Sequence, residues 1–162
     1  MTRPIESVVQ LATFRVGQED YALDIMQIRE IVNPLPVRAV HNAPTFVEGL
    51  IELRGSVIPV IDLRKRFGLE ATAATRRTKF VVVNHKGRAI ALVVDEVGVL
   101  RVPEKEIRDA PGYVSDGGAS YFSGVVSRDG KMYLVLKIEE ILGSSATIDV
   151  AAIRRGVGEP PQ

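Results

Sequence analysis

Apolar residues in this chain occur in short runs separated by glycine-containing polar turns, and helical stripes are few. Several runs alternate apolar with polar side chains or are rich in β-branched residues, which is typical of strands. The Asp129-Gly130 pair between two runs favours the positive backbone angles of a type I′ turn, and Pro59 places its run at a sheet edge or a bulge. The runs predicted as strands are residues 11–16, 21–23, 57–61, 79–83, 88–94, 124–127 and 132–136. Strands at this spacing predict an all-β fold built from barrels rather than from a parallel sheet.

Helical signals are short. The three-residue spacing of Ile25, Ile28 and Ile31 predicts one apolar helical stripe, which the following Asn-Pro pair ends. The segments 62–67 and 138–142 each predict a single helical turn, the first with an aspartate as N-cap and the second ended by a glycine. The fold class is therefore all-β with a few short helices.

The chain also repeats itself at a spacing of 75 residues. The run 57–61 returns as 132–136, and a weaker echo pairs residues 22–25 with 91–94. Three glycines return in the same register, Gly49, Gly55 and Gly68 as Gly124, Gly130 and Gly143. A duplicated strand unit predicts two similar barrels packed together, with the junction near residues 69–77.

Composition excludes several classes of function. The 162 residues carry 21 basic and 20 acidic side chains, so a net charge of +1 gives no general attraction to nucleic acid. Cysteine is absent, which excludes disulfides, thiolate nucleophiles and iron–sulfur clusters. The only histidines, His41 and His85, argue against a histidine-rich metal site.

No catalytic motif appears either. The glycines form neither a phosphate-binding loop nor a nucleophile elbow. The carboxylate pairs Asp95-Glu96 and Glu139-Glu140 join adjacent residues, whose side chains usually point apart, so we expect them to be solvated. We therefore expect no enzyme activity, no cofactor and no metal. We also expect a soluble, cytoplasmic protein, because no signal peptide and no apolar run of the ~20 residues of a membrane helix is present.

Arg54 is the unusual member of the densest region, residues 42–64. This ionised side chain stands between an apolar run and the turn residue Gly55. Near a core it needs an acidic partner, and Glu30 on the preceding segment is the candidate. Alternatively, Arg54 is solvated at the end of a strand.

The order of motifs in this region resembles the CheW family of chemotaxis coupling proteins. The spacing of Asn42, Pro44, Gly49 and the Arg54-Gly55 pair carries the resemblance. It extends through residues 21–25, 28–31, 57–64, 91–97 and 107–111 and covers the chain from residue 11 to 142.

The resemblance implies two SH3-like five-stranded β-barrels packed across a shared hydrophobic seam. The CheW-like domain then spans residues 11–143, with two intertwined barrels divided near residues 69–77. Residues 1–10 form an N-terminal arm, and residues 144–162 form a short helix and a disordered tail.

The resemblance also implies a function. Proteins of this family are non-catalytic adaptors that link methyl-accepting chemoreceptors to the regulatory domain of the CheA histidine kinase. Other CheW-like subunits would be further partners in signalling arrays, to which the adaptor is recruited from the cytoplasm. Neither nucleic acid nor direct membrane insertion is implied.

Family positions map onto two sets of residues. A receptor groove between the barrels would use Ile28, Glu30, Ile31, Gly49 and Arg54, with a Glu30–Arg54 ion pair shaping it. A contact with the kinase or with array neighbours would use Arg108, Tyr113 and Gly124, the last of these at a turn.

A second hypothesis is a plain SH3-like module that binds peptides or strand edges outside any chemoreceptor array. Such a module keeps the barrels but needs no specific groove at Ile28 and Ile31.

Overall fold

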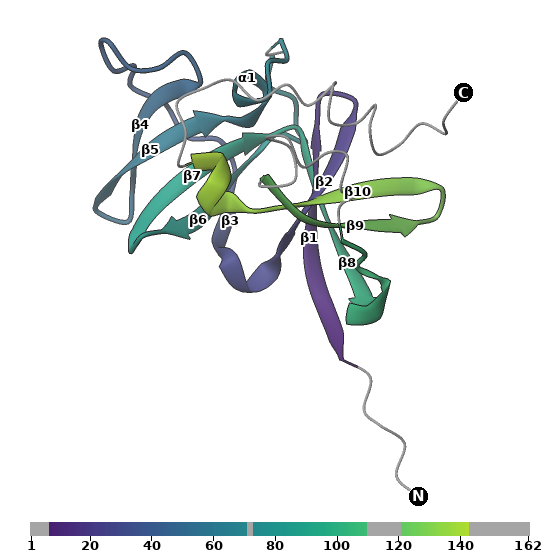
Figure 1. Cartoon of the computed structure of the whole chain (residues 1–162). Helices are drawn as coiled ribbons and strands as arrows, with labels where there is room; N and C mark the ends of the chain where they lie inside the picture. Colours follow the sequence, from purple (N-terminus) through teal and green to yellow (C-terminus); the bar gives the residue numbers. More distant parts are fainter. Residues whose placement is uncertain (1–6, 71–72, 110–120, 143–162) are drawn as a thin grey trace, which may run out of the picture.

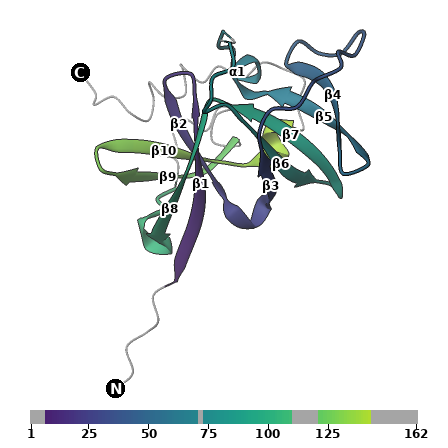
Figure 2. The ribbon, with the colours of Figure 1, turned by 180° about the vertical axis from the view of Figure 1, so that it is seen from behind.

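The computed structural model describes residues 7–70, 73–109 and 121–142, and its strands form two five-stranded sheets (Figure 1). The first, called the terminal barrel because it holds the first and last strands, has the order β8-β1-β2-β10-β9. Its strands are β1 (Val8–Val16), β2 (Glu19–Asp24), β8 (Glu96–Pro103), β9 (Phe122–Arg128) and β10 (Lys131–Leu136). Seen from either side, it lies beside the second sheet (Figure 2).

The second sheet, called the central barrel, has the order β3-β6-β7-β5-β4. Its strands are β3 (Ile28–Val32), β4 (Val47–Leu53), β5 (Ser56–Asp62), β6 (Lys79–His85) and β7 (Arg88–Val94). The short helices are η1 (Ile25–Gln27), α1 (Leu63–Arg66), η2 (Glu104–Glu106) and α2 (Ile138–Leu142). The predicted all-β fold with two barrels and a few short helices is confirmed.

Each barrel is completed by a hairpin from the other sequence repeat. The hairpin β1–β2 joins β10 through the parallel pair β2–β10, and the hairpin β6–β7 joins β5 through the parallel pair β5–β7. In chain order, the segment 69–77 separates the two repeats, after α1 and before β6. The chain passes between the barrels at η1 and at Asp95, so a division near 69–77 is one between sequence repeats.

The register of the strands agrees with the repeat seen in the sequence. Strands β9 and β10 with α2 follow β4 and β5 with α1 at the 75-residue spacing. Val60 pairs with Ala91 in the central barrel, and its repeat equivalent Val135 pairs with Ala22 in the terminal barrel. The weaker echo between residues 22–25 and 91–94 thus reflects two equivalent strands. Asp129 and Gly130 have φ angles of 53° and 77°, as the predicted type I′ turn requires.

The largest buried cluster lies between the barrels and is called the seam below. It draws side chains from both: Ala12, Phe14, Val16, Tyr21, Leu23, Ile61, Leu63, Phe67, Val81, Val83, Leu92, Val94, Phe122, Val125, Leu134, Leu136, Ile138 and Ile141. Two smaller clusters fill the interiors of the central and terminal barrels. Strand faces that point away from a barrel's interior are therefore still buried, which explains the continuous apolar run at residues 80–83.

Arg64 in α1 links the barrels from within the fold. Its guanidinium makes two bonds to Asp62 (Nε–Oδ1 3.0 Å, Nη2–Oδ2 2.9 Å) and one to Asp95 (Nη1–Oδ1 3.1 Å). The second oxygen of Asp95 accepts from the backbone N–H of Gly17, 2.7 Å away in the β1–β2 turn. Asp95, expected to be solvated, is thus part of a network between the barrels, because the chain crosses from β7 to β8 at this residue.

The predicted helical stripe through Ile25, Ile28 and Ile31 is wrong. Only η1 is helical, and residues 28–32 form strand β3, paired with β6. A β-bulge between Ile28 and Glu30 adds one residue to the strand. Two residues three apart then face the same side, so the spacing that indicates a helix also fits a bulged strand.

Two further boundaries differ from the prediction. Strand β1 begins at Val8, inside the segment predicted as an arm, because Val8 and Val9 pair with β8. Strand β5 lies between β4 and β7 and carries no bulge at Pro59, so the predicted edge or bulge is wrong. Pro59 instead stands next to Val60, where pairing with β7 begins. Gly143 and the predicted C-terminal helix and tail lie outside the described residues.

Gly49 fixes the path of the chain beside β4. Its φ is +148°, and a Cβ at this position would lie 2.1 Å from the carbonyl oxygen of Arg38. Arg38 and Leu50 exchange two backbone hydrogen bonds of 2.8 and 2.9 Å, which hold the 33–46 loop against the strand. A side chain at Gly49 must therefore break this bridge.

We expect Gly49→Ala to lower the free energy of unfolding by about 3 kcal/mol or more, since backbone atoms block the new Cβ. Gly55→Ala is the matched control, because Gly55 also has a positive φ of 80° but its Cβ would meet nothing within 4 Å. It should cost only about 1 kcal/mol. Urea unfolding of both variants measures the difference, and equal losses would contradict the steric explanation.

Candidate docking site at strand β3

The bulge in β3 brings the two predicted groove isoleucines to one face. Ile28 lies opposite Val83 and Ile31 lies opposite Val81, both of which belong to the seam. Ile28 is half-buried and packs against the seam, whereas Ile31 is 40% exposed. The apolar surface of the seam therefore continues outward along β3 and ends in an exposed side chain.

Met26, in the short helix η1 that precedes β3, is a further exposed apolar residue, and the sequence did not single it out as a site residue. Its side chain is 86% exposed, the highest value among the exposed large apolar residues of the described chain. Asp24 caps η1 by accepting from the backbone N–H of Met26 at 2.9 Å, so the short helix is held in place. The exposure of this methionine could have been predicted from the sequence only if the turn before β3 had been recognised.

Glu30 and Arg54 form the predicted ion pair. Arg54 Nη2 lies 3.0 Å from Glu30 Oε1, and Nε lies 3.1 Å from Oε2. β3 and β4 are the two edges of the central sheet, and Arg54 directly follows β4, so the pair connects one edge to the turn at the end of the other. Arg54 is nevertheless 75% exposed, so the two alternatives for this residue, paired or solvated, are both partly right.

The ion pair sets the ionisation of both groups. Hydrogen bonds from Arg54 hold the pKa of Glu30 below its ordinary value of 4.5, and the same bonds raise the pKa of Arg54. An exposed pair of this kind adds little to stability. Its main effect is to fix two opposite charges at the edge of the central barrel, because Glu30 lies opposite Val82 and so faces the other side of β3 from Ile31.

Gly49 and Gly124 have equivalent structural positions. Gly124 is buried within β9, so the predicted turn at this residue is wrong. A Cβ on Gly124 would lie 2.7 Å from the carbonyl oxygen of Arg108, just as one on Gly49 would meet Arg38. Both glycines therefore let an outer segment bridge to the strand beside them, and neither presents an exposed surface.

Arg108 lies at the edge of the terminal barrel. It exchanges backbone hydrogen bonds of 2.9 and 2.7 Å with Val125, and its Nη2 lies 3.1 Å from Ser127 Oγ. The structure thus brings Arg108 and Gly124 together, at an edge of the sheet that does not contain β3. Tyr113 lies outside the described residues.

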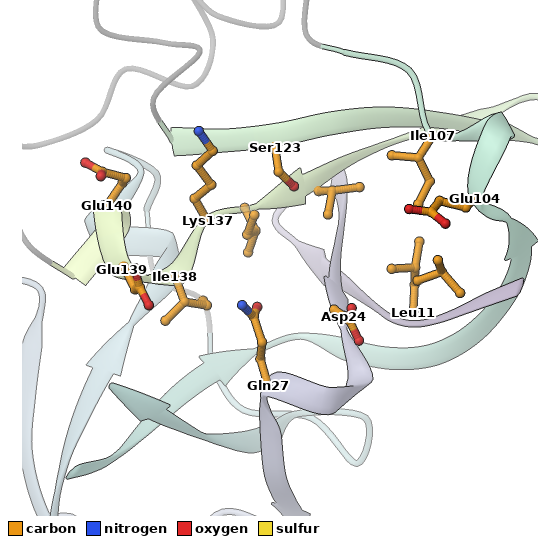
Figure 3. Close-up of a pocket in the computed structure, with 13 residues that line it drawn as sticks. Leu11, Asp24, Gln27, Glu104, Ile107, Ser123, Lys137, Ile138, Glu139 and Glu140 are labelled. Atoms are coloured by element: carbon orange, nitrogen blue, oxygen red, sulfur yellow. The ribbon is translucent and has the colours of Figure 1, made fainter. Parts of the chain in front are cut away.

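A groove of about 630 Å³ opens at the mouth of the terminal barrel, beside η1 (Figure 3). Its apolar floor includes Leu11 and Val135 from the barrel interior. Its rim is acidic, with Asp24, Glu104, Glu139 and Glu140 against the single lysine Lys137, and Figure 3 shows Gln27 of η1 facing it. The groove offers no nucleophile paired with a base.

Two further classes of site are absent from the described residues. No three His, Asp or Glu side chains there come together as metal ligands. None of the helices in those ranges combines the length and apolar character needed to cross a bilayer.

Comparison with known proteins places this arrangement in a family. The model of the CheW-like domain matches residues 10–146, a range close to the predicted 11–143. The chain belongs to the CheW-like family. It is 34% identical to the chemotaxis protein CheW of Rhizobium meliloti, over 83% of this chain and 88% of the relative. It is 36% identical to that of Treponema pallidum, over 83% of this chain and 82% of the relative.

A solved structure of the family has the same fold. The crystal structure of the scaffolding protein TtCheW from Thermoanaerobacter tengcongensis matches with a TM-score of 0.76 and 30% identity, over 86% of this chain and 89% of that chain. The CheW-like family is a scaffold and adaptor family, which agrees with the resemblance inferred from the motifs around Arg54.

The lowered pKa of Glu30 predicts a pH-dependent contribution to stability. A carboxylate whose pKa is depressed on folding stabilises the folded state above its ordinary pKa of 4.5, and this contribution is lost as the pH falls through the lowered value. We expect Arg54→Gln to move the titration midpoint of Glu30 upward toward the ordinary value. Carbon-13 NMR of the Glu30 carboxyl measures this, and an unchanged midpoint would show that the ion pair does not form in solution.

Proposed function

We propose that this CheW-like chain is a non-catalytic adaptor that couples methyl-accepting chemoreceptors to the regulatory domain of a CheA-type histidine kinase. The observation that carries the proposal is the surface at β3, where the seam ends in the exposed Ile31, and where the neighbouring residue of the chain, Glu30, pairs with Arg54. The names of the chemotaxis relatives support the same reading. They favour it over an SH3-like module outside any array.

The receptor partner would dock a helical segment on the β3 surface. Helix-in-groove contacts use a few apolar anchors flanked by polar groups that set the register. Ile31 and Met26 are exposed apolar anchors, and Glu30 and Arg54 supply fixed charges of both signs. Ile28 would support the surface from below, because it already packs against the seam. Gly49 would act indirectly, by holding the adjoining loop in place.

The kinase, or a neighbouring CheW-like subunit, would engage the edge of the terminal barrel. Arg108, Gly124 and Tyr113 are the proposed residues at this contact. The structure describes Arg108 and Gly124, which lie at the backbone bridge between the segment after η2 and strand β9. Separate surfaces would let one copy hold both partners at once, and weak contacts of this kind gain strength when repeated in an array. The adaptor would be recruited from the cytoplasm to receptor arrays.

Ile31→Asp should abolish co-sedimentation with receptor cytoplasmic fragments, with at least a tenfold loss of affinity, since a charge then stands at the apolar anchor. Val40→Asp is the matched control, because Val40 is 43% exposed, close to the 40% of Ile31, but lies outside β3. It should bind receptor normally.

Circular dichroism and urea unfolding establish whether both variants retain the fold. Normal receptor binding by a folded Ile31→Asp variant would remove β3 from the docking surface. Equal loss in both variants would point to a general effect of added negative charge.

A further inference from the structure

A second groove, of about 800 Å³, lies at the tips of the β4–β5 and β6–β7 hairpins. The two tips lie side by side in both views (Figures 1 and 2). The residues that line the groove are Arg29, Ser56, Val57, Ile58, Pro59, His85, Lys86, Gly87, Arg88, Ala89 and Ile90. Arg29 of β3 lines this groove, whereas Ile31, Met26 and Arg54 do not, so the groove adjoins β3 without sharing the exposed apolar residues or the ion pair.

The groove exists because the parallel pair β5–β7 stops short of the hairpin tips. Pairing between these strands runs only from Val60 and Ala91 inward. In an antiparallel ladder, the backbone N–H and C=O groups of successive residues point alternately toward the paired strand and away from it. In the β4–β5 ladder this alternation directs the backbone of Pro59 toward β7, but a proline has no N–H to donate. The ladder therefore ends at Pro59, and the strands separate toward their tips.

Separation leaves backbone groups without a strand partner. By the same alternation, Val57 and Ala89 direct their N–H and C=O groups into the gap rather than toward β4 and β6. Exposed strand edges of this kind accept an added strand. The gap is thus a place where a short extended segment can pair on both sides.

The charges around the groove favour an acidic segment as the added strand. Arg29, Lys86 and Arg88 are exposed cations, and no carboxylate is among the lining residues. His85 adds a buried Nδ1 that has no hydrogen-bond partner. The acidic rim of the groove beside η1 makes the contrast clear, because the same small protein presents two grooves of opposite charge.

An apolar contact accompanies the charges. Val57, the second residue of β5, lines the groove, and its exposed fraction is 67%. An extended segment with alternating acidic and apolar side chains would place its carboxylates toward the cations and an apolar side chain on Val57. Backbone pairing alone would favour any peptide, whereas this lining discriminates by charge.

We propose that this groove binds a short, extended, acidic segment of a partner protein by strand addition between β5 and β7. The carboxylates of the segment pair with Arg29, Lys86 and Arg88, and its backbone pairs with Val57 and Ala89. Apart from Arg29, which lies on β3, the proposal uses no residue of the candidate receptor surface, and it adds a second class of partner contact.

The test uses the full chain and a fluorescein-labelled, end-capped octapeptide of alternating Glu and Val. Fluorescence anisotropy should show saturable binding, and the backbone amide NMR signals of Val57 and Ala89 should shift. Arg88→Glu should weaken binding about tenfold or more, because it replaces an attraction with a repulsion. Arg101→Glu, a charge reversal at an exposed arginine on β8, is the matched control and should leave binding within about twofold.

A second peptide separates strand addition from simple charge attraction. The same sequence N-methylated at alternate residues keeps every charge but loses half of its backbone donors, and it should bind about tenfold more weakly. Equal binding of the two peptides would overturn strand addition, and so would the absence of saturable binding by the first. Displacement of the peptide by a short DNA duplex at lower concentration would indicate a nucleic-acid site and would also overturn the proposal.

Discussion

The exchange of hairpins between the two sequence repeats is the constraint on which the rest of the structure depends. Neither repeat forms a barrel from its own strands alone, because β1–β2 and β6–β7 each complete the barrel of the other repeat. The exchange forces both crossovers, η1 and Asp95, to lie between the barrels. The apolar faces that meet there form the seam, and burial of this cluster opposes any separation of the barrels.

The same exchange positions the candidate docking surface. Strand β3 follows directly on the crossover at η1 and is an edge of the central barrel, so it lies where the seam reaches the surface. The bulge turns Ile28 and Ile31 to the seam side and leaves Glu30 to reach Arg54 across the barrel edges. The docking surface is therefore an extension of the core, and a partner helix placed on it would continue apolar packing that the fold has already begun.

The sequence predicted most strands and the repeat, because alternation and the glycine spacing depend on local geometry. It failed at β3, because the bulge gives the apolar side chains of this strand the three-residue spacing that is typical of a helix. A bulge depends on pairing with the partner strand β6, which the local sequence does not reveal. The sequence predicted the Glu30–Arg54 pair, because an ionised side chain near a core needs an acidic partner and the family resemblance implied the same pair, but the buried network of Arg64 with Asp95 was missed. Adjacent acidic residues look solvated unless one knows that a crossover places Asp95 between two barrels.

The adaptor account requires that one copy hold receptor and kinase together, with the receptor at β3. The chain has no cysteine, so Ile31→Cys provides a single attachment point for a photo-cross-linker in a mixture with a receptor fragment and a kinase regulatory domain. The account predicts a cross-link from this position to the receptor fragment, within complexes whose native mass includes the kinase domain. A cross-link to the kinase domain instead, or a receptor that displaces the kinase domain from the chain, would contradict it.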